Sequence, residues 1–415
     1  MKRRILLLMM TALLSVGAWA ENLWTGELTP NYSANPVQLT TASLGISMGD
    51  ILTFTITATS GDWPTLQLCQ NNPDNQYWPG SAIASVGASV GTVSIIVNEA
   101  ISTAAAEGLW VFGGTYTITS VDYEKKPARY NVFTNSSGES VTYNDHELSK
   151  DKLAGVQKGD MLEINITGTD DWGANFQIYS PAQWNSGTQL LGTTVSGGAS
   201  TKKIVLTDEL VSAAHSNGLF LNGGNYTYTS VDIVYAPTVN ISSAGYATLG
   251  FDESLDLTGI DAYTVTVSDG KAQLNSIKGK KIPAGTGIIL EGSGDVTIPL
   301  TTEATDEIGT NNLHVSDGTV TGDGSTIYVL ANGEHGVGFY KLKSSETVPA
   351  GKAYLISGGV APARQFIGFG DNATGIDNIE HSTPHIEQYY DLQGRRVAQP
   401  TKGLYIVNCK KVIIK

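Results

Sequence analysis

Short segments in which hydrophobic and polar residues alternate recur along most of the chain. In DILTFTIT (50–57), Leu52, Phe54 and Ile56 alternate with threonines, and DMLEINIT (160–167) repeats this pattern. A period of two residues is typical of a β-strand with one face buried and the other in water. These segments are rich in Thr, Tyr, Val and Ile, and Gly, Asn and Asp separate them. The pattern therefore predicts an all-β protein.

The chain also repeats itself with an offset of 110 residues. GLWVFGGTYTITSVDY (108–123) returns as GLFLNGGNYTYTSVDI (218–233). The match extends upstream and predicts two tandem modules, 21–127 and 128–236. About a hundred residues of short alternating strands favour a jelly-roll-like or Greek-key β-sandwich in each module.

Each module predicts one short helix, at 98–108 and at 207–218. Asn98 and Thr207 are suited to cap the first turn of these helices, because their side chains can accept from free backbone N–H groups. Both segments end in glycine, which can adopt the backbone conformation that terminates a helix.

The rest of the chain predicts a third β-rich domain, a linker and a tail. The β-rich domain covers 237–370 and contains an echo, KIPAGTGIIL (281–290) and TVPAGKAYLI (347–356), which is either a weak internal repeat or two hairpins alike by chance. Strand periodicity stops in the linker, 371–387, and returns in the tail, 388–415, predicted to form a small C-terminal β-sandwich-like domain.

The N-terminus has the features of a secretory signal peptide. Three basic residues at 2–4 precede an apolar run, and Ala18 and Ala20 are small residues of the kind that signal peptidase reads. We therefore expect 1–20 to be a signal peptide that is removed before Glu21. An N-terminal membrane helix is the alternative, and the short apolar run disfavours it.

Charge and cysteine content exclude several classes of function. Without 1–20, the chain has 22 Lys and Arg against 39 Asp and Glu, a net charge of −17. Nucleic-acid binding needs positive charge, so that class is disfavoured, as are anionic polymers, whereas a neutral partner fits. Cys69 and Cys409 fall in different predicted domains and are not expected to pair. No Cys and His spacing suits zinc.

The candidates for catalysis and for cofactors are weak. Residues 45–49 match a G-x-S-x-G motif, but a strand follows it where a nucleophile elbow needs a helix. The carboxylates Asp50 and Asp160 recur between modules, which favours structural roles over the paired acids of a glycosidase. The sequence therefore predicts no enzyme and no cofactor. Asp170–Asp171 and Asp323 are either ligands of a structural calcium ion or residues of solvated turns, and the second interpretation is favoured.

Tryptophans supply the strongest functional signal. All six that follow the signal peptide lie in the two modules. Trp24 and Trp110 are replaced by Phe133 and Phe220 in the second copy and are expected in the core. The others lie in or beside polar loops, where a flat ring can stack on a sugar and amides can bind its hydroxyls. For Trp63 and Trp172, core and ligand interpretations are both open. The candidate ligand-binding residues are Trp63, Gln67, Tyr77, Trp78, Trp172, Gln177, Tyr179 and Trp184.

Several of these motifs resemble a known class of modules. LWTGE at 23–27, GDILTFTIT, the TLQLC strand and GLWVFGG resemble the β-sandwich carbohydrate-binding modules attached to glycanases of Gram-negative polysaccharide-degrading bacteria. The resemblance covers 21–236. The second copy departs more, with NVFTNSSGE at 131–139 in place of LWTGE, and no catalytic module accompanies the pair. The resemblance implies that the modules bind a polysaccharide.

The tail has a resemblance of its own. YYDLQGRRV followed by KGLYIVNCKKVIIK is similar to the C-terminal sorting domain of the type IX secretion system, with Asp391, Gly394, Arg395, Gly403 and Tyr405 at matching positions. Cys409 stands where the family has Gly. The resemblance implies export through the periplasm by the type IX machinery, and 237–370 resembles the spacer domains that precede such tails.

Together these expectations describe a secreted or outer-membrane surface protein, a monomer, that binds a neutral plant-type polysaccharide, β-glucan or hemicellulose, without catalysis. A structural or adhesive surface protein with no glycan ligand is the alternative, and a small glycoside hydrolase is the least favoured interpretation.

Overall fold

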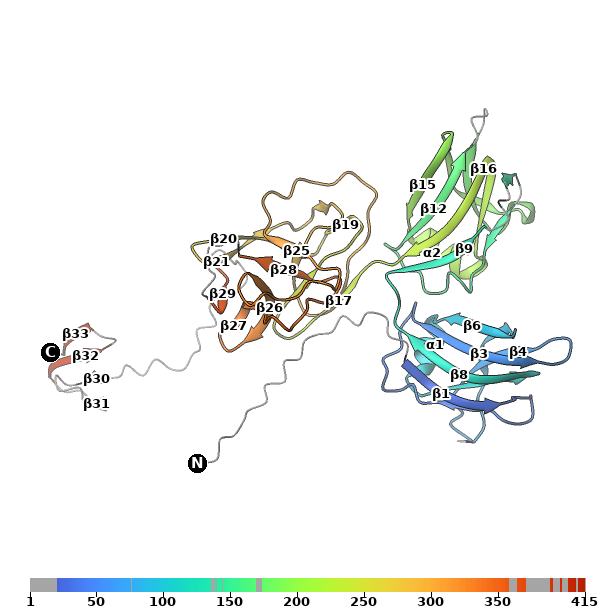
Figure 1. Ribbon diagram of the computed structural model, residues 1–415, viewed down its shortest axis with the longest axis horizontal. Helices are drawn as coiled ribbons and strands as arrows, with labels where there is room; N and C mark the ends of the chain where they lie inside the picture. Colours follow the sequence, from blue (N-terminus) through green and yellow to red (C-terminus); the bar gives the residue numbers. More distant parts are fainter. Residues whose placement is uncertain are drawn as a thin grey trace. The chain divides into compact units, whose positions relative to one another are not determined.

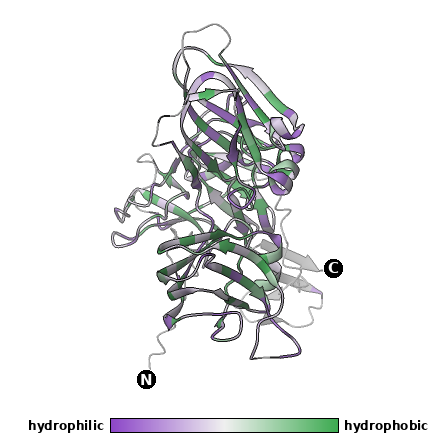
Figure 2. Cartoon of the chain, turned by 90° about the vertical axis from the view of Figure 1, so that its right-hand side faces the viewer, coloured by the Kyte–Doolittle hydropathy of each residue, from purple (hydrophilic) through white to green (hydrophobic). Residues whose placement is uncertain are grey.

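The protein is all-β, as its alternating pattern predicts (Figure 1). The computed structural model describes residues 21–75, 77–135, 138, 140–143, 145–168, 174–357 and 364–370, and in the tail 389–390, 396–397, 402–407 and 410–414. The chain divides into two compact units, Met1–Gly368 and Phe369–Lys415. Hydrophobic and hydrophilic stretches alternate along the strands of the sheets (Figure 2).

The first module is a sandwich of two four-stranded antiparallel sheets. Its strands are β1 (Glu21–Leu28), β2 (Val37–Leu39), β3 (Ile51–Thr59), β4 (Thr65–Gln70), β5 (Ala82–Gly87), β6 (Gly91–Ile96), β7 (Leu109–Gly114) and β8 (Tyr116–Glu124). One sheet has the order β1-β8-β3-β6 and the other β2-β7-β4-β5. Leu52, Phe54 and Ile56 of β3 pack against Leu66 and Leu68 of β4, as their alternation predicts.

The second module repeats this topology with two differences, an added short strand at 140–142 and one long strand in place of two. Its strands are β9 (Arg129–Thr134), β10 (Ser140–Thr142), β11 (His146–Leu148), β12 (Met161–Gly168), β13 (Asn175–Ser180), β14 (Thr188–Thr194), β15 (Gly198–Val205) and β16 (Leu219–Val234). The long strand β16 takes the place of both β7 and β8. Its first half pairs with β11 and β13, and its second half with β9 and β12. One continuous strand therefore serves both halves of the sandwich.

The two short helices lie where the sequence predicts them. They are α1 (Glu99–Ala105) and α2 (Asp208–Asn217). Asn98 Oδ1 accepts from the backbone N–H of Ile101, and Thr207 Oγ1 accepts from that of Leu210. These bonds satisfy donors that the first helical turn leaves without a partner.

The third β-rich domain contains two sheets of the same strand order. Its strands are β17 (Thr238–Ile241), β18 (Tyr246–Leu249), β19 (Leu255–Asp256), β20 (Asp261–Ser268), β21 (Lys271–Ser276), β22 (Lys281–Ile282), β23 (Ile288–Glu291), β24 (Gly294–Thr297), β25 (Leu313–Val315), β26 (Ile327–Gly333), β27 (Gly336–Lys341), β28 (Ala353–Ile356) and β29 (Phe366–Gly368). The orders β18-β23-β20-β21 and β25-β28-β26-β27 correspond strand for strand.

The echoed Pro-Ala-Gly segments occupy equivalent places in these two sheets. Gly285 and Gly351 have φ of 74° and 72°, a left-handed conformation that glycine adopts without strain. After each turn the chain enters the strand, β23 or β28, that pairs with the first strand of the preceding hairpin. The echo is therefore a structural repeat.

The second unit contains a small antiparallel sheet. Its strands are β30 (Tyr389–Tyr390), β31 (Arg396–Val397), β32 (Gly403–Val407) and β33 (Lys410–Ile414), in the order β31-β30-β32-β33. The expected linker, 371–387, lies outside the described residues, as does Cys409. In the part of the chain that the structure describes, no helix is long and apolar enough to cross a membrane.

Candidate functional site

Among the residues whose side chains the structure describes, the exposed aromatic side chains all lie in the two tandem modules. Trp63 is 87% exposed and Trp184 is 76% exposed. Tyr32, Tyr77 and Tyr143 are more than half exposed as well. Exposing a large ring to water is unfavourable, so these rings make the two modules the candidate location of a functional site.

In the first module, aromatic rings cover the outer face of the β2-β7-β4-β5 sheet. Phe112 of β7 points away from the main core, and Trp78 from the β4–β5 loop meets it edge-on, with ring centroids 5.2 Å apart. Tyr32 meets the same ring at 6.4 Å. We call Tyr32, Phe112 and Trp78 the first row. Trp110 is buried as predicted, but on this outer face beside Cys69 and under Trp78, because it alternates with core-facing Val111.

The repeated Gly-Gly pair makes room for this arrangement. Gly113 has φ of 105°, and a Cβ there would lie 2.0 Å from the carbonyl oxygen of Thr65 on the paired strand. A Cβ on Gly114 would lie 2.8 Å from the ring of Tyr32. The first glycine permits the strand to bend against its neighbour, and the second gives the exposed ring a flat surface to lie on.

The second module has the same arrangement around its own glycines. Gly223 has φ of 106°, and its Cβ would lie 2.2 Å from the carbonyl oxygen of Asn175. The ring of Tyr143 lies against Gly224, as the ring of Tyr32 lies against Gly114. A Cβ on Gly224 would lie 2.7 Å from the ring of Tyr143. Tyr226 donates its hydroxyl hydrogen to the carbonyl oxygen of Asn222, and burial raises its pKa far above the ordinary value.

The centre of this second row is polar. Asn222, which is 1% exposed, stands at the place of Phe112. Its Nδ2 donates to Asp145 Oδ1 at 2.7 Å and to Gln183 Oε1 at 3.1 Å, and its Oδ1 accepts from the backbone N–H of Gly223. We call Tyr143, Asn222 and Trp184 the second row.

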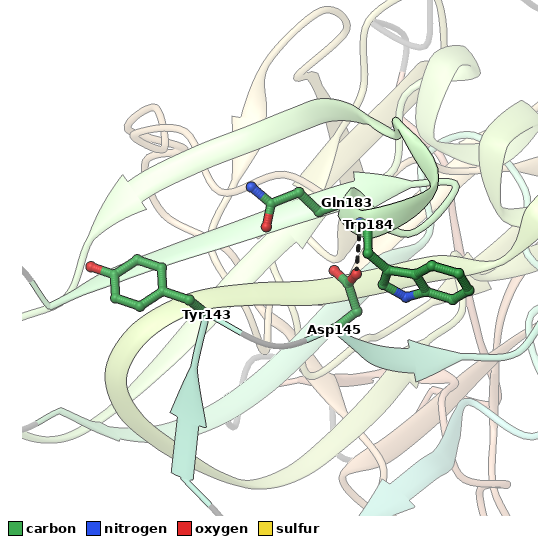
Figure 3. A pocket seen from close by; sticks show the side chains of 4 residues that line it. All are labelled: Tyr143, Asp145, Gln183 and Trp184. Carbon is green, nitrogen blue, oxygen red and sulfur yellow. Dashed lines mark hydrogen bonds between the residues drawn. The ribbon is translucent and has the colours of Figure 1, made fainter.

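An open pocket of about 650 Å³ lies over this polar centre. Figure 3 shows Tyr143 and Trp184 on opposite sides of Asp145 and Gln183, which point into the space between them. Gln183 and Trp184 belong to the 3-10 helix η1 (Gln183–Asn185), and the backbone N–H of Trp184 donates to Asp145 Oδ2 at 3.4 Å. The pocket therefore combines a carboxylate, an amide and two rings.

The candidate residues of the first module lie in different environments. Trp63 is exposed in the loop before β4, and Tyr77 is exposed in the loop after it. Trp78 is half-buried against Phe112, and Gln67 is half-buried on β4. Because a strand rises about 3.3 Å per residue, Trp63 and the loop after β4 lie roughly 20 Å apart along the strand. The structure thus distributes these candidates over the face and does not gather them in one cluster.

In the second module, Trp184 lines the pocket. Gln177 is half-buried on β13, opposite Asn222. Tyr179 is buried, and its hydroxyl donates to Gln189 Oε1 at 3.0 Å. Trp172 lies outside the described residues.

Sequence reasoning missed five residues that the structure adds to the site: Tyr32, Tyr143, Asp145, Gln183 and Asn222. The two tyrosines are 111 residues apart, close to the repeat offset, so a repeat alignment extended into this dissimilar stretch is a signal that finds them. No comparable signal marks Asp145 and Gln183, both of which accept a hydrogen bond from Asn222.

The other chemical candidates have structural partners. The backbone N–H of Ser47 donates to Asp50, and its hydroxyl donates to the carbonyl oxygen of Gly45, which places the G-x-S-x-G motif in a turn. Asp323 accepts from the hydroxyl of Thr326 and from the backbone N–H groups of Ser325 and Thr326, which lowers its pKa. Asp170–Asp171 lies outside the described residues. In the described part of the chain, no three His, Cys, Asp or Glu side chains gather as a metal site requires.

Comparison with known proteins adds no family to this description. No protein-family model matches the chain, and no curated protein matches it either.

Proposed function

We propose that this chain is a non-catalytic glycan-binding protein that recognises a neutral plant-type polysaccharide, β-glucan or hemicellulose, through its two tandem modules. The observation that carries the proposal is that, among the residues whose side chains the structure describes, the exposed aromatic rings all lie in these two modules. Flat rings stack on the apolar C–H faces of sugar rings, and nearby amides and carboxylates bind the hydroxyls.

The charge of the chain and the composition of the pocket support this proposal. A net charge of −17 without the signal peptide suits a neutral polymer better than an anionic one. A glycosidase needs two carboxyl groups flanking one bond. Of the described residues that line the pocket, Asp145 alone is a carboxylate, so the arrangement favours binding over hydrolysis.

Retention on polysaccharide tests the proposal. The mature chain, 21–415, is expected to be retarded in an affinity gel that contains xyloglucan or cellulose, and to release no reducing sugar. Trp63→Ala removes an exposed ring, so retention falls while the free energy of unfolding changes by less than about 0.5 kcal/mol. Val90→Ala, at another exposed apolar position of the same module, is the matched control and keeps retention. A chain that no neutral glycan retards would favour the adhesive or structural function.

The localisation follows from the tail. We propose that the unit Phe369–Lys415 directs export to the cell surface or medium through the type IX machinery, on the basis of its sorting-domain resemblance and its separate small sheet. Deleting 376–415 is expected to leave the modules folded and trapped in the periplasm. Cell fractionation with an antibody to the first module measures this, and normal surface display of the truncated chain would refute the sorting role.

A further inference from the structure

The two rows have the same position in the fold but opposite chemistry at their centres. In the first row Phe112 is buried and contacts both neighbouring rings, so the face is closed and apolar. In the second row Asn222 occupies this position and holds polar side chains above it. This exchange turns an aromatic platform into a polar pocket.

Asn222 fixes the direction of both polar groups in the pocket. Both of its N–H hydrogens are used, one by Asp145 and one by Gln183. Because the Oε1 of Gln183 accepts from Asn222, its Nε2, on the other arm of the amide, is directed away from Asn222. Asp145 uses Oδ1 toward Asn222, and its Oδ2 accepts from the backbone N–H of Trp184 in a long contact of 3.4 Å, so Oδ2 retains acceptor capacity for the pocket. The pocket is thus lined by one strong acceptor and one amide donor.

This pairing suits neighbouring hydroxyl groups, because a hydroxyl can donate to a carboxylate while the next accepts from an amide. The flanking rings of Tyr143 and Trp184 supply apolar surfaces for the C–H groups of the same molecule. A ligand carboxylate would be repelled by Asp145. These properties select a neutral, polyhydroxylated ring.

We propose that the pocket of the second module binds a single neutral sugar ring of the glycan through two adjacent hydroxyls, with Asp145 as acceptor and Gln183 as donor, whereas the first row is an unselective aromatic platform. This inference rests on the proposed function and names the module and the groups that give it selectivity. It also makes the second copy, whose sequence departs more from carbohydrate-binding modules, the more discriminating one.

Two isosteric exchanges test the assignment in the full mature chain. Asp145→Asn keeps an oxygen for Asn222 but presents a donor to the pocket. Gln183→Glu likewise keeps an oxygen for Asn222 but presents a second carboxylate. Each is expected to weaken binding of cellohexaose or of xyloglucan oligosaccharides about tenfold or more, because a charge-assisted bond is lost or two acceptors repel. The double variant has one carboxylate and one amide again, and we expect its affinity to return to within about threefold of the original.

Isothermal titration with these two probes measures the affinities, and thermal melting checks that each variant is folded. Glu147→Gln is the matched control, because Glu147 is an exposed carboxylate two residues from Asp145 that does not line the pocket. If the unaltered chain binds and both single variants bind as tightly as Glu147→Gln, the pocket assignment is overturned. Glycan binding then belongs to the first row. A double variant weaker than either single variant also overturns it. No binding of any neutral glycan by the unaltered chain overturns this inference and the proposed function together.

Discussion

Gly223 and Gly224 are neighbours in the sequence but meet different demands. Gly223 has positive φ and leaves no room for a Cβ beside the backbone of Asn175. Gly224 is limited only by the ring of Tyr143, the far end of a flexible side chain. One glycine is therefore required by the backbone, and the other by the exposed side chain that rests on it.

Alanine exchanges separate these two roles. Gly223→Ala is expected to destabilise the protein by about 2–3 kcal/mol, because it combines a left-handed backbone with a clash against a carbonyl. Gly224→Ala should change the free energy of unfolding by less than about 1 kcal/mol and move the ring of Tyr143, which weakens glycan binding. Denaturant unfolding and isothermal titration measure the two effects. Full binding by Gly224→Ala would remove Tyr143 from the site.

The site could be predicted from the sequence only in part, and the reason lies in single residues. The alternation in LFLNGG places Asn222 on the face opposite Leu221, so an outward position was readable. The first copy has Phe112 there, which suggests packing and hides the polar role. Asp145 and Gln183 come from segments 38 residues apart, and only strand pairing within the sandwich brings them together. The spacing of residues along the chain therefore does not predict that these two side chains lie close together.

Among the elements, a repeated carboxylate ties the turn before a central strand to the segment that leaves the module. Asp50 accepts from the backbone N–H groups of Ser47 and Lys126, and Asp160 accepts from those of Gln157 and Ala236. Asp50 also accepts from the hydroxyl of Tyr123 and from Lys125 Nζ. These side-chain partners are replaced in the second module.

Burial raises the pKa of Asp160 to about 6, against the backbone bond from Ala236 and the charge of Lys126, which lower it. A folded-state pKa above the ordinary 3.8 means that the folded protein holds this proton more tightly than the unfolded chain. The contribution of Asp160 to stability is therefore complete below about pH 4 and is lost as the pH rises through about 6.

Asp160→Asn tests this pH dependence. In the unaltered protein, the titration of Asp160 is expected to lower the free energy of unfolding by about 3 kcal/mol between pH 4 and 7. Asparagine does not ionise, so the variant should not show this decrease. Because other carboxylates titrate equally in both proteins, the difference between the two stability profiles isolates Asp160. Parallel profiles would assign the pH dependence to other groups.

The sequence was most informative about the secondary-structure elements. Alternation over β3 and β12 predicted strands with the correct buried faces, since a period-two pattern has one meaning when flanked by turns. The alternating pattern did not predict that β16 runs unbroken where β7 and β8 are separate strands. Thr115 and Asn225, at equivalent positions, both have positive φ, and only the strand pairing around them differs. That difference depends on tertiary contacts and not on local preference.

For the whole molecule, duplication gives a binding protein an advantage that it does not give a single enzyme site. Four residues, 125–128, separate β8 of the first module from β9 of the second. Binding of one module to a polymer therefore holds the other near the same chain, and the second contact becomes intramolecular. The gain depends on the ligand, because a short oligosaccharide cannot occupy two sites at once.

We therefore expect a difference between long and short ligands in the mature chain. Tyr32→Ala together with Trp78→Ala removes two rings of the first row and disables the first module, and Trp184→Ala disables the second. On long xyloglucan, each change should lower the affinity by about a hundredfold, because avidity is lost together with one site. On cellohexaose, the unaltered chain should bind no more tightly than the better of the two variants, since only one module engages each molecule. Isothermal titration of these three proteins against both ligands separates avidity from intrinsic affinity. If the ratio of affinities for the long and the short ligand is the same in the unaltered chain and in the variants, the modules act independently. Duplication would then serve to bind two different polysaccharide chains.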